Sequence, residues 1–284
     1  MKILITGGSG KIGKKLINKL LEFNNYNIKV LSRNNNKNYN NIKLVVGDLL
    51  YIDSLQNALK EVNLVIHLAG LTHTNNYNLY YKINTIGTEN LVKACENSDV
   101  KKIIYISSRT ASNNGGAYAK SKLLAEEKIK NSSLDWVILS LSEVYGAGED
   151  EFISKLINII KKSYFTPIIG DGNYLLSPVH VDDVISCIIN AINNGIINKK
   201  YIIAGSEEFT LNEIVDYVIK NLKVTRIKIH IPIILIKLIA FIFYLLKINF
   251  ITRDQIPRLI CKKPSDISLA KKELNFKPRN FNIC

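Results

Sequence analysis

Short apolar runs alternate with amphipathic segments along the first half of the chain. The β-rich apolar runs lie at 2–6, 27–32, 42–46, 63–68, 101–107 and 135–141. Segments with apolar residues at helical spacing separate them, at about 11–23, 53–60, 77–97 and 118–131. Alternation of this kind predicts an α/β fold built on a parallel, doubly wound sheet. In such sheets ligands bind in the crevice at the carboxyl ends of the strands.

The pattern becomes less regular after Gly146. Apolar spacing predicts a helix at 152–162, and proline with glycine predicts a turn at 167–172. A further helix at 180–194 is expected to return toward the sheet. No internal repeat and no long linker is visible, so the second half should build most of a smaller lobe, chiefly from 205–284.

The segment 229–247 is the most apolar of the chain, although Lys237 interrupts it and Lys247 ends it. A membrane-spanning helix needs about 20 predominantly apolar residues. We therefore expect a helix buried in the smaller lobe. Peripheral membrane contact through 231–246 is the next interpretation, and a true span is the last.

A glycine-rich turn joins the first apolar run to the first helical segment. Residues 6–13 read Thr-Gly-Gly-Ser-Gly-Lys-Ile-Gly. In a dinucleotide site one glycine permits the tight turn, one lets the pyrophosphate approach the backbone, and one lets the helix pack against the strand. The free N–H groups at the helix start then face the phosphates. Gly8, Gly10 and Gly13, placed between a strand and an amphipathic helix, therefore predict a dinucleotide site.

Tyr118 and Lys122 lie one helical turn apart in the segment at 118–131. An ammonium at that spacing favours the phenolate and lowers the pKa of a phenol from about 10. Taken alone, the pair fits a solvated helix face equally well. With a dinucleotide loop upstream, it predicts a proton-transfer centre.

Together these motifs resemble the extended short-chain dehydrogenase/reductase superfamily, and most closely its NAD-dependent epimerase/dehydratase branch of nucleotide-sugar epimerases, dehydratases and 4-reductases. Further segments match that branch in order: 47–49, 65–70, 84–91, 103–108, 144–146 and 180–183. The resemblance implies that 1–146 form an NAD(P)-binding Rossmann domain, with a return segment near 175–204, and that 147–284 are mainly a substrate-binding lobe. It also implies a homodimer, formed through the helices at 77–97 and 118–131.

The resemblance implies particular site residues. Ser108 is expected to complete a catalytic triad with Tyr118 and Lys122, with Ser107 as the alternative. Cofactor contacts are expected from Gly7, Ser9, Gly10, Lys11, Ile12, Gly13, Ser32, Arg33, Asp48, Leu49, Leu68, Ala69, Gly70, Asn84, Ile106, Tyr118, Lys122 and Leu141. Substrate contacts are expected from Thr72, Ser108, Thr110, Tyr118 and Glu143, and no metal ligand is expected.

The choice of cofactor rests on a missing carboxylate. Sites for NAD place an acidic residue about 20 residues beyond the glycines, on the ribose 2′-OH. Between Glu22 and Asp48 the sequence has none, and the second strand ends at Ser32-Arg33. Arg33 can pair with a 2′-phosphate. NADP(H) is therefore slightly favoured over NAD(H), while stacking of Arg33 on adenine stays open.

The sequence departs from the family pattern where relatives contact substrate. Arg109 begins a stretch that replaces the usual Val-Tyr-Gly after the catalytic serine, and Glu143 stands where relatives place an Asn or a similar polar residue. The Arg-Pro before Val144 is absent, and so is the arginine that often precedes Val179. These losses weaken the usual UDP-hexose pose. Other arginines are then candidates for the diphosphate: Arg226, Arg253 and Arg258.

Two classes of function follow. The first is a nucleotide-sugar epimerase or 4-keto reductase of surface-polysaccharide synthesis, acting on a nucleoside-diphosphate or lipid-linked sugar. A ketone reductase of the steroid or dihydroflavonol type is the alternative enzyme. The second class is a non-catalytic NADP(H)-binding regulator. A complete set of Ser108, Tyr118 and Lys122 favours the enzyme, and Arg109-Thr110 in place of an Asp-Glu pair disfavours a dehydratase.

Composition adds little to this interpretation. The net charge is +14, but the lysines are dispersed among asparagines and isoleucines, and no nucleic-acid-binding module is visible. A positive field would help to capture anionic cofactors and sugar diphosphates. Four cysteines without Cys-x-x-Cys spacing, and Met1 leading straight into the first strand, predict a cytoplasmic protein with reduced thiols.

Overall fold

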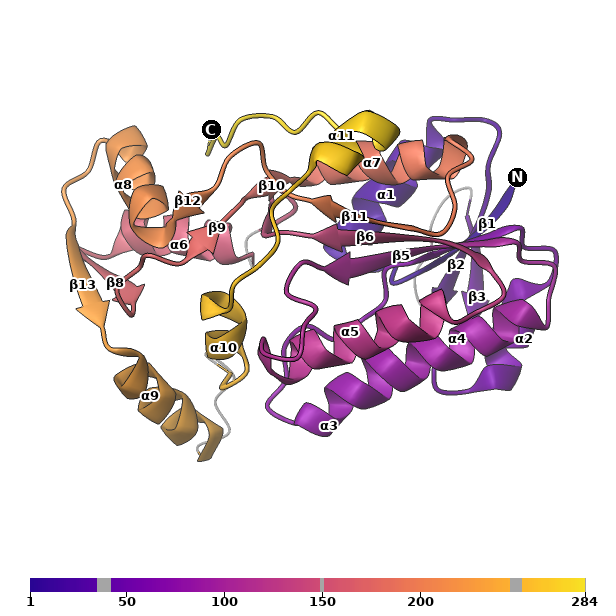
Figure 1. Cartoon of the computed structure of the whole chain (residues 1–284), viewed down its shortest axis with the longest axis horizontal. Coiled ribbons are helices and arrows are strands. Elements are labelled where there is room, and N and C mark those ends of the chain that lie inside the picture. Colours follow the sequence, from indigo (N-terminus) through magenta and orange to yellow (C-terminus); the bar gives the residue numbers. More distant parts are fainter. Residues whose placement is uncertain (35–41, 149–150, 246–251, 284) are drawn as a thin grey trace.

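A seven-stranded parallel sheet forms the centre of the molecule (Figure 1). The fold comes from a computed structural model that describes residues 1–34, 42–148, 151–245 and 252–283. The sheet contains β1 (Lys2–Thr6), β2 (Asn27–Ser32), β3 (Lys43–Val46), β4 (Leu64–His67), β5 (Lys102–Ser108), β6 (Asp135–Leu141) and β11 (Lys199–Ile203). Its strand order is β11-β6-β5-β4-β1-β2-β3. The order reverses between β1 and β4, which places the expected ligand crevice at their carboxyl ends.

Helices cover both faces of this sheet (Figure 1). On one face lie α1 (Lys11–Leu21), α7 (Val181–Asn193) and α11 (Ser268–Leu274). On the other lie α2 (Ile52–Leu59), α3 (Tyr77–Tyr80), the π-helical turn η1 (Tyr81–Ile86), α4 (Gly87–Glu96) and α5 (Gly116–Lys130). Each face has its own apolar core. The α/β, doubly wound fold expected from the sequence is therefore confirmed.

Burial explains why these segments form these elements. Ile3, Leu4 and Ile5 of β1 are fully buried, as a strand covered on both faces requires. In α1, Leu16, Ile17 and Leu20 are buried on one side of the helix. One expectation needs correction: the helix predicted over 77–97 is interrupted by η1, where the backbone widens for one turn.

A second lobe extends beyond the carboxyl edge of the sheet. It contains α6 (Phe152–Lys162), β8 (Phe165–Ile169), β9 (Leu175–Leu176), β12 (Phe209–Thr210), α8 (Leu211–Leu222), β13 (Ile227–Ile231), α9 (Ile233–Leu245) and α10 (Gln255–Ile260). Strands β8 and β13 pair in parallel, and β9 pairs with β12 in antiparallel fashion. Two further short strands, β7 (Val144–Tyr145) and β10 (Val179–His180), pair where the two parts of the chain meet.

The turn predicted at 167–172 is partly wrong. Pro167 lies inside β8, opposite Ile229 of β13. Among the described residues strand β8 pairs only with β13, so a proline there loses no hydrogen bond to a strand on its other side. The turn itself is formed by Gly170 and Gly172, which have φ angles of 65° and 72°.

The prediction of a buried apolar helix is wrong. In α9 the buried side chains are Ile236 and Ala240, and most of the other large apolar side chains are exposed. Lys247, which ends the apolar segment, and residue 246 lie outside the described residues. Within the described ranges no helix is long and apolar enough to cross a membrane.

The C-terminal segment returns to the sheet a second time, which the sequence pattern did not indicate. Ala270 and Leu274 of α11 join the apolar core beside α7 and β11. Farther on, the Arg279 guanidinium and backbone N–H donate to the Asp183 carboxylate of α7, over 2.8–3.1 Å. The last part of the region 147–284 therefore fastens the second lobe to the sheet.

A buried carboxylate joins α5 to three strands. Glu126 is fully buried and accepts hydrogen bonds from Ser107 Oγ at 2.6 Å and Ser140 Oγ at 3.3 Å. Lys200 Nζ of β11 donates to its other oxygen at 2.7 Å. Because α5 carries Tyr118 and Lys122, this anchor fixes the height of both side chains above the sheet.

We expect Glu126→Ala to lower the free energy of unfolding by about 1.5–3 kcal/mol, because two hydroxyls and a cation lose the charged group to which they donate hydrogen bonds. Urea unfolding at neutral pH measures the change. Glu127→Ala, its exposed neighbour on α5, is the matched control and should stay within about 0.5 kcal/mol of wild type. Equal effects of the two substitutions would contradict the anchor.

Candidate active site

Three glycines shape the loop between β1 and α1. Gly7 has a φ of 73°, and a Cβ there would lie 2.5 Å from Ala69 N of the adjacent loop. A Cβ on Gly13 would lie 2.4 Å from Gly7 O, so α1 packs directly on the turn. A Cβ on Gly10 would meet Gly7 O alone, at 3.2 Å, and Gly10 N-caps α1 with an exposed backbone. The loop therefore fits a pyrophosphate that approaches Gly10 and the first N–H groups of α1.

The other predicted cofactor residues surround this loop at the carboxyl ends of the strands. Ser9, Lys11 and Ile12 lie at the start of α1. Leu68, Ala69 and Gly70 follow β4, and Ala69 N donates to Thr6 Oγ1 at 3.2 Å. Ile106 and Leu141 are buried in β5 and β6, and Leu49 is buried against Gly87 of α4. Asp48 follows β3, and its Oδ1 accepts from Leu50 N at 2.9 Å.

A buried histidine supports the loop from below. His67 Nδ1 lies 2.6 Å from Thr6 Oγ1, and His67 Nε2 lies 2.9 Å from Thr88 Oγ1. Burial, together with the smaller effect of the Lys122 cation, lowers the pKa of His67 to about 3. The imidazole is therefore neutral near pH 7, and it links β1, β4 and α4 without adding charge to the site.

The serine and tyrosine predicted for catalysis meet above β5. Ser108 Oγ lies 2.8 Å from Thr110 Oγ1 and forms a hydrogen bond with Tyr118. Ser107, the alternative, points to the opposite face and donates to Glu126. The geometry therefore favours Ser108. Thr110 is buried, and its hydroxyl is bonded to Ser108, so it orients that serine.

Lys122 lies deeper than a surface helix position would. Its Nζ donates to Ile106 O at 2.8 Å and stands 4.1 Å from the centre of the Tyr105 ring. Burial lowers the pKa of Lys122 to about 7, although Glu126 one turn below raises it. A Cβ on Gly70 would lie 3.9 Å from this ammonium, so Lys122 reaches the loop that follows β4.

The cation that faces Tyr118 is Arg258, which sequence analysis considered only for the diphosphate. Its guanidinium carbon stands 4.5 Å from the centre of the Tyr118 ring. Burial raises the pKa of the Tyr118 phenol, and Arg258 and the Ser108 hydrogen bond lower it in part. The expectation that Lys122 would govern this pKa is therefore corrected: Lys122 is directed toward Tyr105 and Ile106.

Helix α10 brings a second group to the start of α5. Asp254 Oδ1 accepts from Ala117 N at 2.5 Å and from Tyr118 N at 3.3 Å, so it satisfies free N–H groups of the helix. Arg258, one turn later, donates to Thr72 O at 3.0 Å. The four-residue spacing of Asp254 and Arg258 indicates that the two side chains share one face of a helix. Nothing in the sequence indicates which other helix that face contacts.

Asn84 lies in η1 and supports the cofactor-side loop. Its Nδ2 donates to Leu71 O and to Ser121 Oγ, each at 3.0 Å, and its Oδ1 accepts from Leu71 N at 2.7 Å. Both amide hydrogens are therefore used within the protein. The side chain holds the segment after Gly70 against α5, and the π-helical turn directs it there.

Glu143, expected to contact substrate, is held in a buried ion network. Its Oε2 accepts from Arg109 Nη2 at 2.7 Å, and Lys263 Nζ lies 3.4 Å from its Oε1. Burial acts to raise the pKa of Glu143, but Arg109, Lys263 and hydrogen bonds from Ser142 and Ser177 hold it below its usual value. The carboxylate therefore stays ionised and joins β6 to the segment after α10.

The expected contact to the cofactor's adenosine side lies at the end of β2. Arg33 is exposed and directly follows Ser32, whose Oγ donates to Asn34 O at 2.8 Å. The next residues, 35–41, lie outside the described ranges. An exposed guanidinium at this position remains compatible with a 2′-phosphate.

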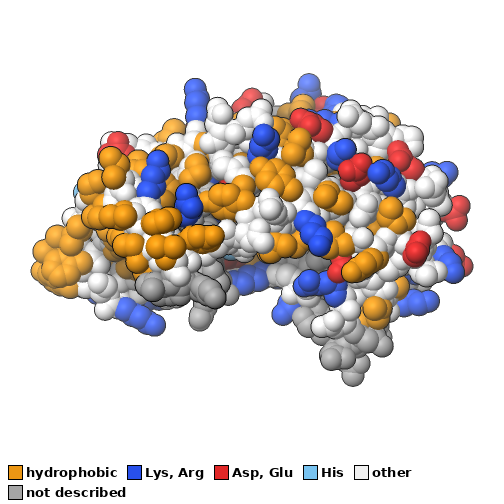
Figure 2. Space-filling view, turned by 90° about the horizontal axis from the view of Figure 1, so that it is seen from below, with side chains coloured by type: hydrophobic (Ala, Val, Ile, Leu, Met, Phe, Trp, Pro, Cys, Tyr) orange, Lys and Arg blue, Asp and Glu red, His pale blue; other side chains and the backbone are white. Residues whose placement is uncertain are grey.

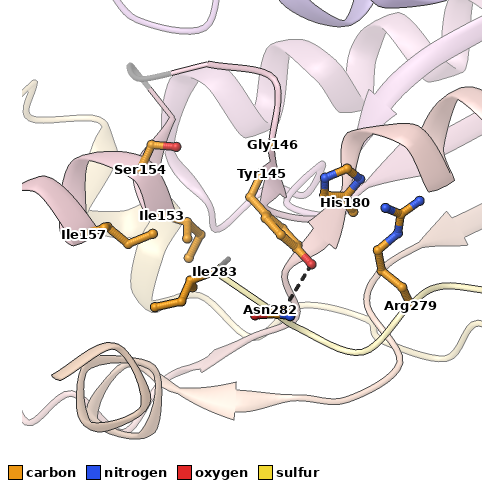
Figure 3. A pocket seen from close by; sticks show the side chains of 9 residues that line it. All are labelled: Tyr145, Gly146, Ile153, Ser154, Ile157, His180, Arg279, Asn282 and Ile283. Carbon is orange, nitrogen blue, oxygen red and sulfur yellow. Dashed lines mark hydrogen bonds between the residues drawn. The ribbon is translucent and has the colours of Figure 1, made fainter. Parts of the chain in front are cut away.

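Two pockets lie on either side of the junction between the lobes. One, of about 290 Å³, is lined by Tyr145, Gly146, Ile153, Ser154, Ile157, His180, Arg279, Asn282 and Ile283 (Figure 3). Tyr145 packs edge-to-face on His180 there, with ring centres 5.1 Å apart. The other, of about 260 Å³, is lined by Ser112, Asn114, Pro257, Ile260, Cys261 and Lys262. It lies between α10 and the loop that leads from Ser108 to Tyr118, and is therefore the better candidate for the substrate side.

Known proteins resemble this chain over most of its length. A sequence model of the family described as NAD dependent epimerase/dehydratase matches residues 3–204. A putative UDP-glucose 4-epimerase of Methanocaldococcus jannaschii is 32% identical over 251 residues, which cover 76% of this chain and 81% of that protein. An uncharacterized membrane protein of the same organism is 37% identical over 144 residues, but the match covers 46% of this chain and only 43% of that protein.

A solved structure agrees with this fold. The UDP-glucuronic acid 4-epimerase from Bacillus cereus, in complex with UDP-glucuronic acid and NAD, superposes with a TM-score of 0.78 at 22% identity. The superposition covers 98% of this chain and 94% of that chain. At this identity the likeness shows the shared fold.

We expect Arg258→Met to raise the pKa of Tyr118 further above that of a free phenol, because an opposite charge beside a phenol favours its ionised form. The ¹³Cζ resonance of labelled Tyr118, assigned with Tyr118→Phe and followed from about pH 8 upward through the titration, measures the direction of the change. Arg253→Met is the matched control, because Arg253 stacks 5.7 Å from Phe241 instead. An unchanged Tyr118 titration in Arg258→Met would exclude the electrostatic role.

Proposed function

The chain belongs to the NAD dependent epimerase/dehydratase family, enzymes of the extended short-chain dehydrogenase type, and we propose that it interconverts a carbinol and a ketone at one carbon of a nucleotide sugar. The observation that carries this proposal is the meeting of Ser108, Tyr118 and the glycine loop at one edge of the sheet. The nicotinamide cofactor supplies the hydride chemistry when bound. The protein supplies proton transfer and orientation.

Tyr118 exchanges a proton with the substrate oxygen in this proposal, and Ser108 donates a hydrogen bond to the same oxygen. Thr110 supports the assignment because its hydroxyl orients Ser108. Lys122 is placed to hold the ribose hydroxyls of the cofactor, since it is buried behind Gly70. A lysine with a pKa of about 7 can bind there as a cation or as a neutral amine.

The substrate class follows from the relatives and from the site together. Relatives named UDP-glucose and UDP-glucuronic acid 4-epimerases support a UDP-hexose as the substrate. We propose that the enzyme acts on it as an epimerase or 4-keto reductase in surface-polysaccharide synthesis. Because Arg109 and Lys263 are already paired with Glu143, we propose that Arg258 and Lys262 face the anionic part of the substrate. A homodimer and a cytoplasmic location stay predictions.

Incubation with UDP- and dTDP-sugars plus NADPH or NADH tests the function, followed by nicotinamide absorbance and sugar identity. Net oxidation of cofactor indicates a reductase, and inversion without net oxidation indicates an epimerase. We expect Tyr118→Phe to lower turnover about 10²–10⁴-fold, the usual contribution of a general acid or base. Tyr77→Phe, on a half-exposed tyrosine of α3, is the control.

If no sugar is turned over and Tyr118→Phe is indistinguishable from wild type in every assay, the proposal is overturned. Turnover of a steroid or flavonoid ketone instead would assign the alternative enzyme. Binding of NADPH without any turnover would assign the regulator.

Preference for NADP(H) is tested by Arg33→Ser. We expect the Kd for NADPH to rise roughly 10-fold, because a charge-assisted pair with the 2′-phosphate is lost, while that for NADH changes little. Nicotinamide fluorescence titration measures both constants. Lys43→Ser removes an exposed cation from the neighbouring strand β3 as a control. Equal weakening of both cofactors by Arg33→Ser would instead indicate stacking on adenine.

A further inference from the structure

Helix α9 presents a continuous apolar face to solvent. Ile234, Leu238, Phe241, Ile242 and Leu245 recur at intervals of three and four residues, so they share one side of the helix. Their exposed fractions are 82%, 53%, 43%, 44% and 61%. Ile236 and Ala240, on the opposite side, hold α9 to the lobe through Ile256 of α10. Within the described part of the chain this apolar face is therefore largely exposed, and the contact that it makes is with Arg253, stacked on Phe241.

The face continues beyond α9 onto the adjacent two-stranded sheet. Phe165 of β8 and Ile227 and Ile229 of β13 are each exposed by 44–51%. Figure 1 shows α9 at the extremity of the molecule, far from the central sheet. Figure 2 shows apolar side chains gathered at this end of the molecule, with Lys and Arg side chains beside them. The surface is a projection rather than a groove, since one helix forms its edge.

Cations predominate around this surface, although Asp216 pairs with Lys228 of β13 at its edge. Between Asp216 and Asp254 the sequence has seven Lys and Arg and no Asp or Glu. Lys237 stands on α9 itself, and Arg253 stacks on Phe241 at 5.7 Å. An apolar helix face bordered by cations is typical of helices that lie in the interface of an anionic bilayer.

We propose that α9, with the adjoining edge of β8 and β13, docks on the surface of an anionic lipid bilayer. The described part of the helix has 13 residues, about 20 Å in length, which is too short for a hydrocarbon core of about 30 Å. It therefore lies along the interface. The proposal goes beyond the proposed function and does not rest on it.

A second copy of the chain fits this surface less well. Two projecting helices bury little area against each other, and a symmetric pair would bring Lys237 and Arg253 of both copies into one interface, where α9 has no carboxylate to neutralise them. A bilayer accepts a projecting helix without a matching groove, and anionic headgroups neutralise the bordering cations.

Cosedimentation with vesicles of phosphatidylcholine, with and without phosphatidylglycerol, tests the docking. We expect wild type to sediment with vesicles containing phosphatidylglycerol, less at high salt. The triple variant Ile234→Gln, Leu238→Gln, Ile242→Gln should bind roughly 10-fold more weakly or worse. Tyr51→Gln with Ile197→Gln removes exposed apolar side chains elsewhere and should bind like wild type. Circular dichroism and thermal unfolding check that both variants fold.

Absence of wild-type sedimentation at low salt would overturn the proposal, and so would equal loss in both variants. A wild-type dimer in sedimentation velocity that the triple variant abolishes, without vesicle binding, would assign the surface to a second copy instead. Each result is read without any assay of turnover, so failure of the docking proposal and failure of the proposed function are distinguished.

Discussion

Burial of Tyr118 on α5 is the constraint on which the rest of the site depends. Desolvation opposes the ionised phenol, so a buried tyrosine can transfer protons only where cations and hydrogen bonds counteract that cost. Lys122 is itself buried, and its own pKa is lowered, which limits the charge that it brings. The structure supplies Arg258 from another lobe and Ser108 from β5. The electrostatics of the phenol therefore depend on how the two lobes pack against each other.

The central sheet could be predicted from the sequence because its signals are local. Ile3 to Ile5 form a run that only a strand covered on both faces buries completely, and the glycines of residues 7–13 each meet a steric limit in the turn that they form. The break in the helix at η1 could not be predicted, since it depends on Asn84 bonding to Leu71 and Ser121, far along the chain. The spacing of apolar residues that predicts a helix does not indicate such a distant hydrogen-bond partner.

The substrate side was the least predictable part, for the same reason. Glu143 looked like a polar contact for substrate, because its buried partners, Arg109 and Lys263, are 34 and 120 residues away. The apolar sequence of α9 likewise predicted a position in the core. The smaller lobe covers one side of this helix, although almost all of its side chains are apolar. The burial of Glu143 and of α9 therefore depends on how the assembled lobes pack, which the local sequence does not show.

Helices α9 and α10 connect the exposed surface to Tyr118. Ile236 and Ala240 of α9 pack with Ile256 of α10. Arg258 of the same helix lies on the Tyr118 ring, and Asp254, just before α10, accepts a hydrogen bond at the start of α5. A shift of α9 against its support would therefore move the cation that lowers the pKa of Tyr118. Because Asp254 bonds two N–H groups of α5, α10 resists sliding along that helix. Residues of the second lobe thus set the electrostatics of the buried Tyr118 phenol.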